Sequence, residues 1–309
     1  MAVPRAPLLI FGTVALDTIL TATDRRDRIL GGSGVHAGLA AALYGPVRLV
    51  SAIGEDFPEA SLGCLRRAGI DLAGVVRRAG RRSMSWTGRY SADLSSRETL
   101  EVDLDIFQGL SLSVPEAWRD APSVFLANGD PRDQLRILES VRGVRCAVAD
   151  TMNHWLREAR VPLERLARRI TGLILNDEEA IEWTGLPSVP AAARKLLALG
   201  PKFVIVKRGE HGSLIACSEG LAPVPAYPVE GVRDPTGAGD TFAGALLACL
   251  GSSANPSLAE LRRAALTGSV AASFCVEAFG TERLQGLTRA SCDARRKSLV
   301  EFSALDPRS

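Results

Sequence analysis

The stretch Asp234-Pro-Thr-Gly-Ala-Gly-Asp240-Thr-Phe242 (DPTGAGDTF) follows a proline-rich extended segment and leads into an apolar run over 242–250. We expect a helix to begin at or near Ala238. The first amides of a helix have no partner inside it, and glycine lets the backbone approach a bound anion closely. Gly237, Ala238 and Gly239 therefore predict an anion-binding loop at the start of this helix.

Asp240 falls in the first turn of the predicted helix. A carboxylate there has a structural interpretation, because the helix dipole stabilises negative charge at the N-terminus. A carboxylate beside a bound phosphate can also accept the proton of an attacking hydroxyl group during phosphoryl transfer. The complete motif around Asp240 favours this second interpretation.

Short apolar runs recur along the rest of the chain and predict strands over 8–14, 47–53, 124–127, 144–149, 173–175, 203–206 and 214–217. Helical patterns of mixed charge separate several of them, over 35–44, 60–68, 132–141, 163–169, 178–184 and 191–199. Near-continuous apolar runs are typical of strands that are covered on both faces. The alternation predicts an α/β fold with a mostly parallel central sheet between two layers of helices.

Two segments depart from this alternation. The segment 82–108 is polar and partly alternating, which favours a hairpin outside the main sheet. The segment 21–31 is charged and ends at the first glycine of the pair Gly31 and Gly32. We expect a single domain over 1–309 in which these two segments form a small β-sheet lid; two solvated loops are the alternative.

Composition narrows the classes of function. The chain has 309 residues, 46% of them hydrophobic, which excludes a disordered protein. Its 37 basic and 35 acidic residues leave a net charge of +2, which predicts neither a nucleic-acid nor a membrane-surface partner. The chain start has no signal-peptide pattern, and the six scattered cysteines form no C-x-x-C pair. We therefore expect a cytoplasmic protein.

The 234–242 motif resembles the C-terminal signature of the ribokinase-like (PfkB) carbohydrate kinase family, whose members phosphorylate sugars, nucleosides and related alcohols with ATP. The segments 12–17 (GTVALD), 31–34 (GGSG), 176–179 (NDEE) and 207–212 (KRGEHG) also resemble family motifs, in the family's order. The resemblance covers nearly the whole chain. It implies a ribokinase-like three-layer sandwich with a small β-sheet lid.

The resemblance also implies an acceptor-binding side. Asp17, at the end of the first predicted strand, would accept hydrogen bonds from two substrate hydroxyls, and Gly31 and Gly32 would lie under the sugar. A turn or cap acid, and a plain glycine turn, are the structural alternatives. His36 stands where the family often has an amide side chain, so we expect either a substrate contact or a structural histidine.

The predicted lid contributes two further candidates for substrate binding, Trp86 and Arg89. Trp86 and Tyr90 fall on the same face of the predicted strand. That face could cover the acceptor, although a lid sheet also needs aromatic side chains for its own packing. Either role is compatible with the sequence.

On the nucleotide side, Asn176 follows a buried run and opens a helix, which is equally typical of an N-cap. With the anion loop in the same chain, Glu179 is expected to act on Mg²⁺ through water. Asp234 is the candidate for a monovalent cation, K⁺, as in many members of the family. The expected nucleotide-binding residues are Asn176, Lys207, Gly209, Thr236 and Gly239.

These observations predict an ATP-dependent kinase that phosphorylates a primary hydroxyl of a small sugar. Asp240 would be the base, and the loop of Gly237, Ala238 and Gly239 the anion hole. A nucleoside kinase of the same family is the alternative acceptor class. A non-catalytic sugar or nucleoside sensor is the alternative from another class of protein, although it would not need the base. A lid with exposed edges also predicts a homodimer.

Overall fold

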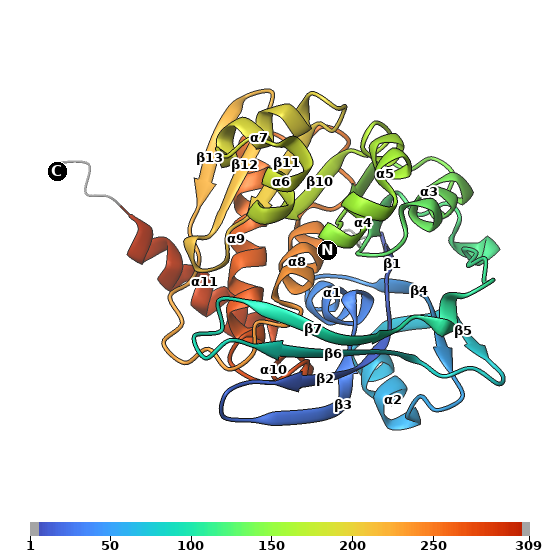
Figure 1. The fold of residues 1–309 in the computed structure, drawn as a ribbon. Helices are drawn as coiled ribbons and strands as arrows, with labels where there is room; N and C mark the ends of the chain where they lie inside the picture. The colour runs from blue at the N-terminus through green and yellow to red at the C-terminus, as the bar shows by residue number, and fades with distance from the viewer. Residues whose placement is uncertain (1–5, 305–309) are drawn as a thin grey trace.

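The computed structural model describes residues 6–304, and a single large sheet runs through its centre (Figure 1). Its strands lie in the order β13-β12-β11-β10-β9-β8-β1-β4-β5. They are β1 (Leu8–Phe11), β4 (Val47–Gly54), β5 (Ile70–Arg78), β8 (Ser123–Leu126), β9 (Cys146–Ala149), β10 (Gly172–Asn176), β11 (Phe203–Lys207), β12 (Ser213–Cys217) and β13 (Gly220–Val224). All neighbouring pairs are parallel except β11–β12 and β12–β13.

Helices cover both faces of this sheet, because its strands are apolar on both sides. Leu9 and Ile10 of β1 are both fully buried, yet they belong to separate cores. The Ile10 core contains side chains of α1 (Ser33–Ala42), α2 (Glu59–Arg67), α8 (Ala238–Leu250), α9 (Leu258–Cys275), α10 (Glu282–Gln285) and α11 (Arg289–Ser303). The Leu9 core contains side chains of α3 (Pro131–Ser140), α4 (Asn153–Glu158), α5 (Arg160–Ala167), α6 (Asp177–Thr184) and α7 (Val189–Leu197). The three-layer α/β prediction is therefore confirmed.

A second, four-stranded sheet lies beside the N-terminal ends of α1 and α8 (Figure 1). Its order is β3-β2-β6-β7, with β2 (Ala15–Leu20), β3 (Arg25–Gly31), β6 (Met84–Tyr90) and β7 (Arg97–Asp103). The β6–β7 hairpin falls within the predicted segment 82–108. We call this sheet the lid.

The first lid segment is longer than predicted. The expected strand over 8–14 ends at Phe11, and the lid begins at Ala15 rather than at residue 21. Asp17 therefore lies within β2 of the lid, so its expected place at the end of the first main-sheet strand is wrong. The sequence does not reveal this change of sheet, because the residues on both sides of it are apolar. Val14, Ala15 and Leu16 are as buried in the structure as the residues of β1.

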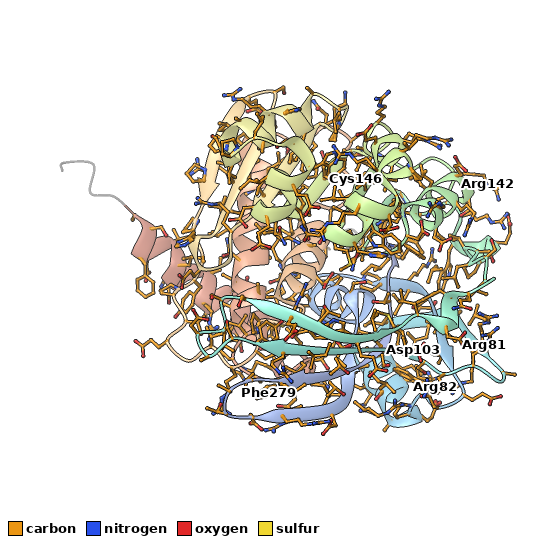
Figure 2. The ribbon with its side chains drawn as sticks, viewed as in Figure 1. Arg81, Arg82, Asp103, Arg142, Cys146 and Phe279 are labelled. Carbon is orange, nitrogen blue, oxygen red and sulfur yellow. The ribbon has the colours of Figure 1, made fainter. Side chains whose placement is uncertain are left out.

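The lid is joined to the main domain by apolar and polar contacts. Ile19, Tyr90 and Phe279 form a small buried cluster, and Figure 2 shows Phe279 beside the lid strands. The hydroxyl groups of Tyr90 and Thr236 are hydrogen-bonded, 2.9 Å apart, so β6 contacts the loop before α8 directly. Within residues 6–304, no helix is both long enough and apolar enough to span a membrane.

Candidate active site

The anion loop has the predicted form. Gly237 caps α8 with φ 72°, a left-handed conformation that favours glycine, and the helix begins at Ala238 as expected. The amides of Gly237 and Gly239 have no hydrogen-bond partner among residues 6–304. Two donors at a helix N-terminus are thus free to bind an anion.

Asp240 points from the first turn of α8 into a cluster of buried charges. Its pKa is raised to about 7, first by desolvation and then by the nearby carboxylate of Asp150, while Lys207 and Arg97 partly offset this rise. A carboxyl group with a pKa near neutrality is suited to accept and release a proton at physiological pH.

Lys207 and Asp150 form a buried ion pair beside Asp240. Nζ of Lys207 lies 2.7 Å from Oδ2 of Asp150, and the two side chains are 17% and 5% exposed. Burial alone would lower the pKa of Lys207, but Asp150 and Glu179 raise it overall, so the lysine keeps its charge. A methyl group built on Gly239 would lie 2.9 Å from Nζ, which places this cation against the anion loop.

Asp150 was not among the predicted site residues. It follows β9, just as Lys207 ends β11, and the carboxyl ends of parallel strands are where open α/β sheets bind ligands. Its position directly after a predicted strand could have identified Asp150 from the sequence. Gln134 of α3, fully buried, holds this edge in place by donating to the carbonyl oxygens of Leu126, Ala127 and Asp150, each at 3.0 Å.

Asn176 and Glu179 form a capping box at the start of α6. The amide of Glu179 donates to Oδ1 of Asn176 at 2.7 Å, and Oε2 of Glu179 accepts from the amide of Asn176 at 2.8 Å. The N-cap interpretation of Asn176 is therefore correct, and its side chain is occupied by this role. Oε1 of Glu179 has no hydrogen-bond partner within the described chain, and its carboxyl pKa is raised by burial and by Asp150.

Glu179 fits the expected role toward Mg²⁺. No group of three or more Asp, Glu, His or Cys side chains among residues 6–304 could enclose a metal ion. Mg²⁺ bound with nucleotide phosphates needs only one or two carboxylates and keeps several waters. The free Oε1 of Glu179, near Asp150 and Lys207, matches that requirement.

On the acceptor side, Asp17 faces the diglycine. A methyl group built on Gly31 would lie 1.9 Å from Oδ2 of Asp17, so only glycine leaves room for this carboxylate. Burial raises the pKa of Asp17 to about 7; the Gly32 amide offsets part of this, and the charges of Asp234 and Asp240 add to it. Within residues 6–304, no cation is among the groups that act on the pKa of Asp17.

The two predicted lid contacts differ in position. Trp86 lies opposite Asp17 in the β2–β6 register, its ring lies over Gly88, and its Nε1 donates to Oγ1 of Thr99 at 3.2 Å. Arg89 falls on the other face of β6 and pairs with Glu98 in solvent. The structure therefore places Trp86 beside Asp17 and Arg89 on the opposite, solvent-exposed face of β6.

A different arginine, Arg97, reaches into the site. It pairs with Tyr90 in the β6–β7 register, and its guanidinium lies 5.5 Å from the centre of the Trp86 ring. It is close enough to Asp240 and Glu179 to offset part of the rise in the pKa of both carboxyl groups. The sequence did not identify Arg97, because which face of a lid strand looks inward depends on the pairing register.

The remaining predicted residues surround the loop without joining the charge cluster. Both carboxylate oxygens of Asp234 accept backbone hydrogen bonds, from Thr236 at 2.9 Å and Gly280 at 2.8 Å. The side chain of Thr236 contacts Tyr90 of the lid. Gly209 has φ 53° in the exposed turn after β11. His36 is buried and lies under Gly237.

Known proteins share this architecture. The model of the pfkB family of carbohydrate kinases matches residues 17–285. A cytidine kinase from Thermococcus kodakarensis is 33% identical over 246 residues, which cover 78% of this chain and 87% of that protein. The nucleoside kinase of Burkholderia thailandensis in complex with inosine has a TM-score of 0.74 at 21% identity, covering 94% of this chain and 97% of that one. A putative ribokinase II from E. coli in complex with ATP and Mg²⁺ has a TM-score of 0.77 at 18% identity, covering 96% and 99%.

The family model spans most of the chain, so the protein belongs to the pfkB family of carbohydrate kinases. It is therefore an ATP-dependent kinase with a carbohydrate or nucleoside acceptor.

The buried charge of Asp17 predicts a pH-dependent effect on stability. Its folded pKa of about 7 lies above its ordinary value of 3.8, so its contribution to stability is present below about pH 4 and is lost as the pH rises through 7. Asp17→Asn should therefore stabilise the ligand-free protein more at pH 8 than at pH 5, by on the order of 2 kcal/mol. Denaturant unfolding at the two pH values measures this difference.

Asp93→Asn is the control. Hydrogen bonds from Ser91 and Ser95 lower the pKa of Asp93 to about 2, so this exposed group is ionised at both pH values. Its substitution should have the same effect at pH 5 and pH 8. If the effect of Asp17→Asn on the free energy of unfolding is also the same at pH 5 and pH 8, the pKa of Asp17 is not raised in the folded protein.

Proposed function

We propose that this protein transfers the γ-phosphoryl group of ATP to a primary hydroxyl of a nucleoside, with Asp240 as the general base. The position of Asp240 carries the proposal. The residue is half-buried at the start of α8, next to the free amides of Gly237 and Gly239, and two cations, Lys207 and Arg97, act on its pKa. This arrangement can remove a proton on one side and receive phosphoryl charge on the other.

In the proposed reaction, Asp240 takes the proton of the acceptor hydroxyl while that oxygen bonds to the γ-phosphorus. The bond from phosphorus to the bridging oxygen breaks, and ADP leaves with the electron pair. The amides of Gly237 and Gly239, with Lys207 and Arg97, stabilise the charge of the transferred group. Mg²⁺ bound with ATP supplies further charge neutralisation on the side of Glu179.

Asp17 orients the acceptor in this proposal by accepting two of its hydroxyl groups above Gly31 and Gly32. Such positioning converts an intermolecular reaction into one between held groups, which is a large part of catalysis in phosphoryl transfer. Trp86, on the inner face of the lid, is placed to cover the ring or base of the acceptor.

The acceptor class rests on the relatives and on the lid. The cytidine kinase of T. kodakarensis and the inosine-bound nucleoside kinase of B. thailandensis favour a nucleoside over the free sugar expected from the sequence. The aromatic ring of Trp86 suits a base. A free sugar is the second candidate, since both classes share the hydroxyls that Asp17 would bind.

The test is a panel of ribonucleosides and free sugars assayed for ADP release and for phosphorylated product. It is run with K⁺ and with choline in its place, because we also propose that a K⁺ ion binds beside Asp234. Asp240→Asn should lower kcat by about 10²–10⁴-fold for the best acceptor, since the amide keeps the shape of the side chain and loses its basicity. ATP affinity should stay within about threefold of wild type.

Three outcomes contradict this proposal. Turnover of Asp240→Asn within tenfold of wild type would remove the base assignment. A parallel loss of ATP affinity would assign Asp240 to nucleotide binding instead. Binding of an acceptor without any ADP release by the wild-type protein would favour the non-catalytic sensor.

Variants of the two lid arginines test which of them acts in the site: Arg97, which the structure places near Asp240, or Arg89, which the sequence predicted. Arg97→Gln removes a cation from the reacting phosphoryl group, so kcat should fall by about tenfold or more. Arg89→Gln loses only a solvent-exposed pair with Glu98, and kcat should stay within about twofold. Steady-state kinetics with the best acceptor decides between them. A larger loss in the Arg89 variant would mean that the inner face of β6 is assigned wrongly.

We also propose that two copies associate through the lid. β3 and β7 are its edge strands, and β7 exposes two apolar side chains, Leu100 and Val102, which are 41% and 48% exposed. Edge strands with apolar side chains favour pairing with a second copy. Sedimentation velocity should show a dimer that Val102→Asp converts to a monomer. A monomeric wild-type protein at micromolar concentration would contradict the proposal.

A further inference from the structure

His36 occupies a position that the acceptor cannot reach. The side chain is 1% exposed and lies in the first turn of α1, directly behind the diglycine. Burial lowers its pKa, so the imidazole is neutral near pH 7. The expectation of a direct substrate contact therefore does not agree with the position of His36 in the fold.

One ring nitrogen of His36 is tied to the acceptor floor. Nδ1 lies 3.1 Å from the carbonyl oxygen of Gly32. A carbonyl oxygen can only accept, so the ring donates from Nδ1 here. Nε2 is buried and makes no hydrogen bond of ordinary geometry among the described residues, but the backbone of Gly280 is near enough to the ring to raise its pKa as a hydrogen-bond partner. The imidazole thus interacts with two backbone segments, which an apolar side chain of the same volume could not do.

The other edge of the ring lies against the anion loop. A methyl group built on Gly237 would lie 2.2 Å from Cδ2 and 2.3 Å from Nε2 of His36. The loop backbone therefore rests on the imidazole with no room for a side chain between them. The backbone of Gly280, whose amide donates to Asp234, lies close to the same ring. His36 thus touches both halves of the active site.

We propose that His36 is a positioning residue that sets the distance between the acceptor floor at Gly32 and the anion loop at Gly237. The proposal rests on the kinase function above. Gly32 and Gly31 position the hydroxyl that attacks, and Gly237 donates to the phosphoryl group that is attacked. The ring of His36 is the contact that joins them. A displacement of about 1 Å between reacting groups can cost 10²-fold in rate.

The test compares two variants of His36 with a control on the same helix. His36→Ala removes the ring and the hydrogen bond. His36→Asn places an amide nitrogen near the position of Nδ1 and removes only the edge that contacts Gly237. Leu39→Ala, at a residue 2% exposed in the next turn of α1, should lower the stability of the same helix, and the atoms nearest to a methyl group built on Gly237 belong to His36.

Two measurements are made on each variant. The first is hydrogen exchange of the backbone amides over 234–241 in the ligand-free protein, which does not depend on activity. The second is kcat and KM for ATP and for the best acceptor of the panel, per folded molecule. We expect faster exchange over 234–241 in both His36 variants and a fall in kcat of about tenfold or more, with both KM values within about threefold. Leu39→Ala should change neither.

Unchanged exchange over 234–241 in both His36 variants would overturn the proposal, whatever the kinetics. A rise in acceptor KM at constant kcat would also overturn it, because that pattern indicates a direct substrate contact. So would a His36→Asn variant as active as wild type. If the wild-type protein phosphorylates no acceptor at all, the kinase function fails, and the exchange measurement alone still decides whether His36 holds the loop.

Discussion

The buried ion pair between Lys207 and Asp150 is the interaction on which the active site depends. Its cation, Lys207, lies near three carboxyl groups that would otherwise repel one another. They belong to Asp150, Glu179 and Asp240. A buried pair of this kind contributes little net stability, but removing one partner leaves an uncompensated charge. The lysine therefore balances the negative charge of the strand ends, and it does so directly against the anion loop.

The same charges explain why the site is built at the edge of the sheet. Each member of the cluster is held by a rigid element: Lys207 by β11, Asp150 by the end of β9, Glu179 and Asp240 by the first turns of α6 and α8. Burial then moves the pKa of Asp240 toward neutrality, where proton transfer is efficient. The folded chain carries this desolvation cost in the absence of any ligand.

The sequence predicted those parts of the site that lie in one continuous stretch. The anion loop over 234–239 and the capping box of Asn176 and Glu179 are local, so residue order is enough to find them. Arg97 and the place of Asp17 depend on strand pairing, which changes which residues face inward. His36 was predicted as a residue of interest, but its contact with Gly237 joins segments about two hundred residues apart, and no local pattern encodes it.

The way the lid strands β2 and β3 are joined to the main domain has a consequence for how this fold can diversify. The chain leaves the main sheet after Phe11 and returns to the main domain at Ser33, the first residue of α1. The two ends of this excursion are bound to each other: the amide of Thr13 donates to Oγ of Ser33 at 3.1 Å, and the amide of Ser33 donates to Oγ1 of Thr13 at 2.9 Å. The segment between them is an insertion whose two ends are held together by hydrogen bonds. Lengthening or shortening its hairpin turn leaves β1 and α1 undisturbed, because loop length is a small thermodynamic term once the ends are fixed. Evolution can therefore remodel the outer part of the lid while the main domain, with its nine-stranded sheet, stays constant.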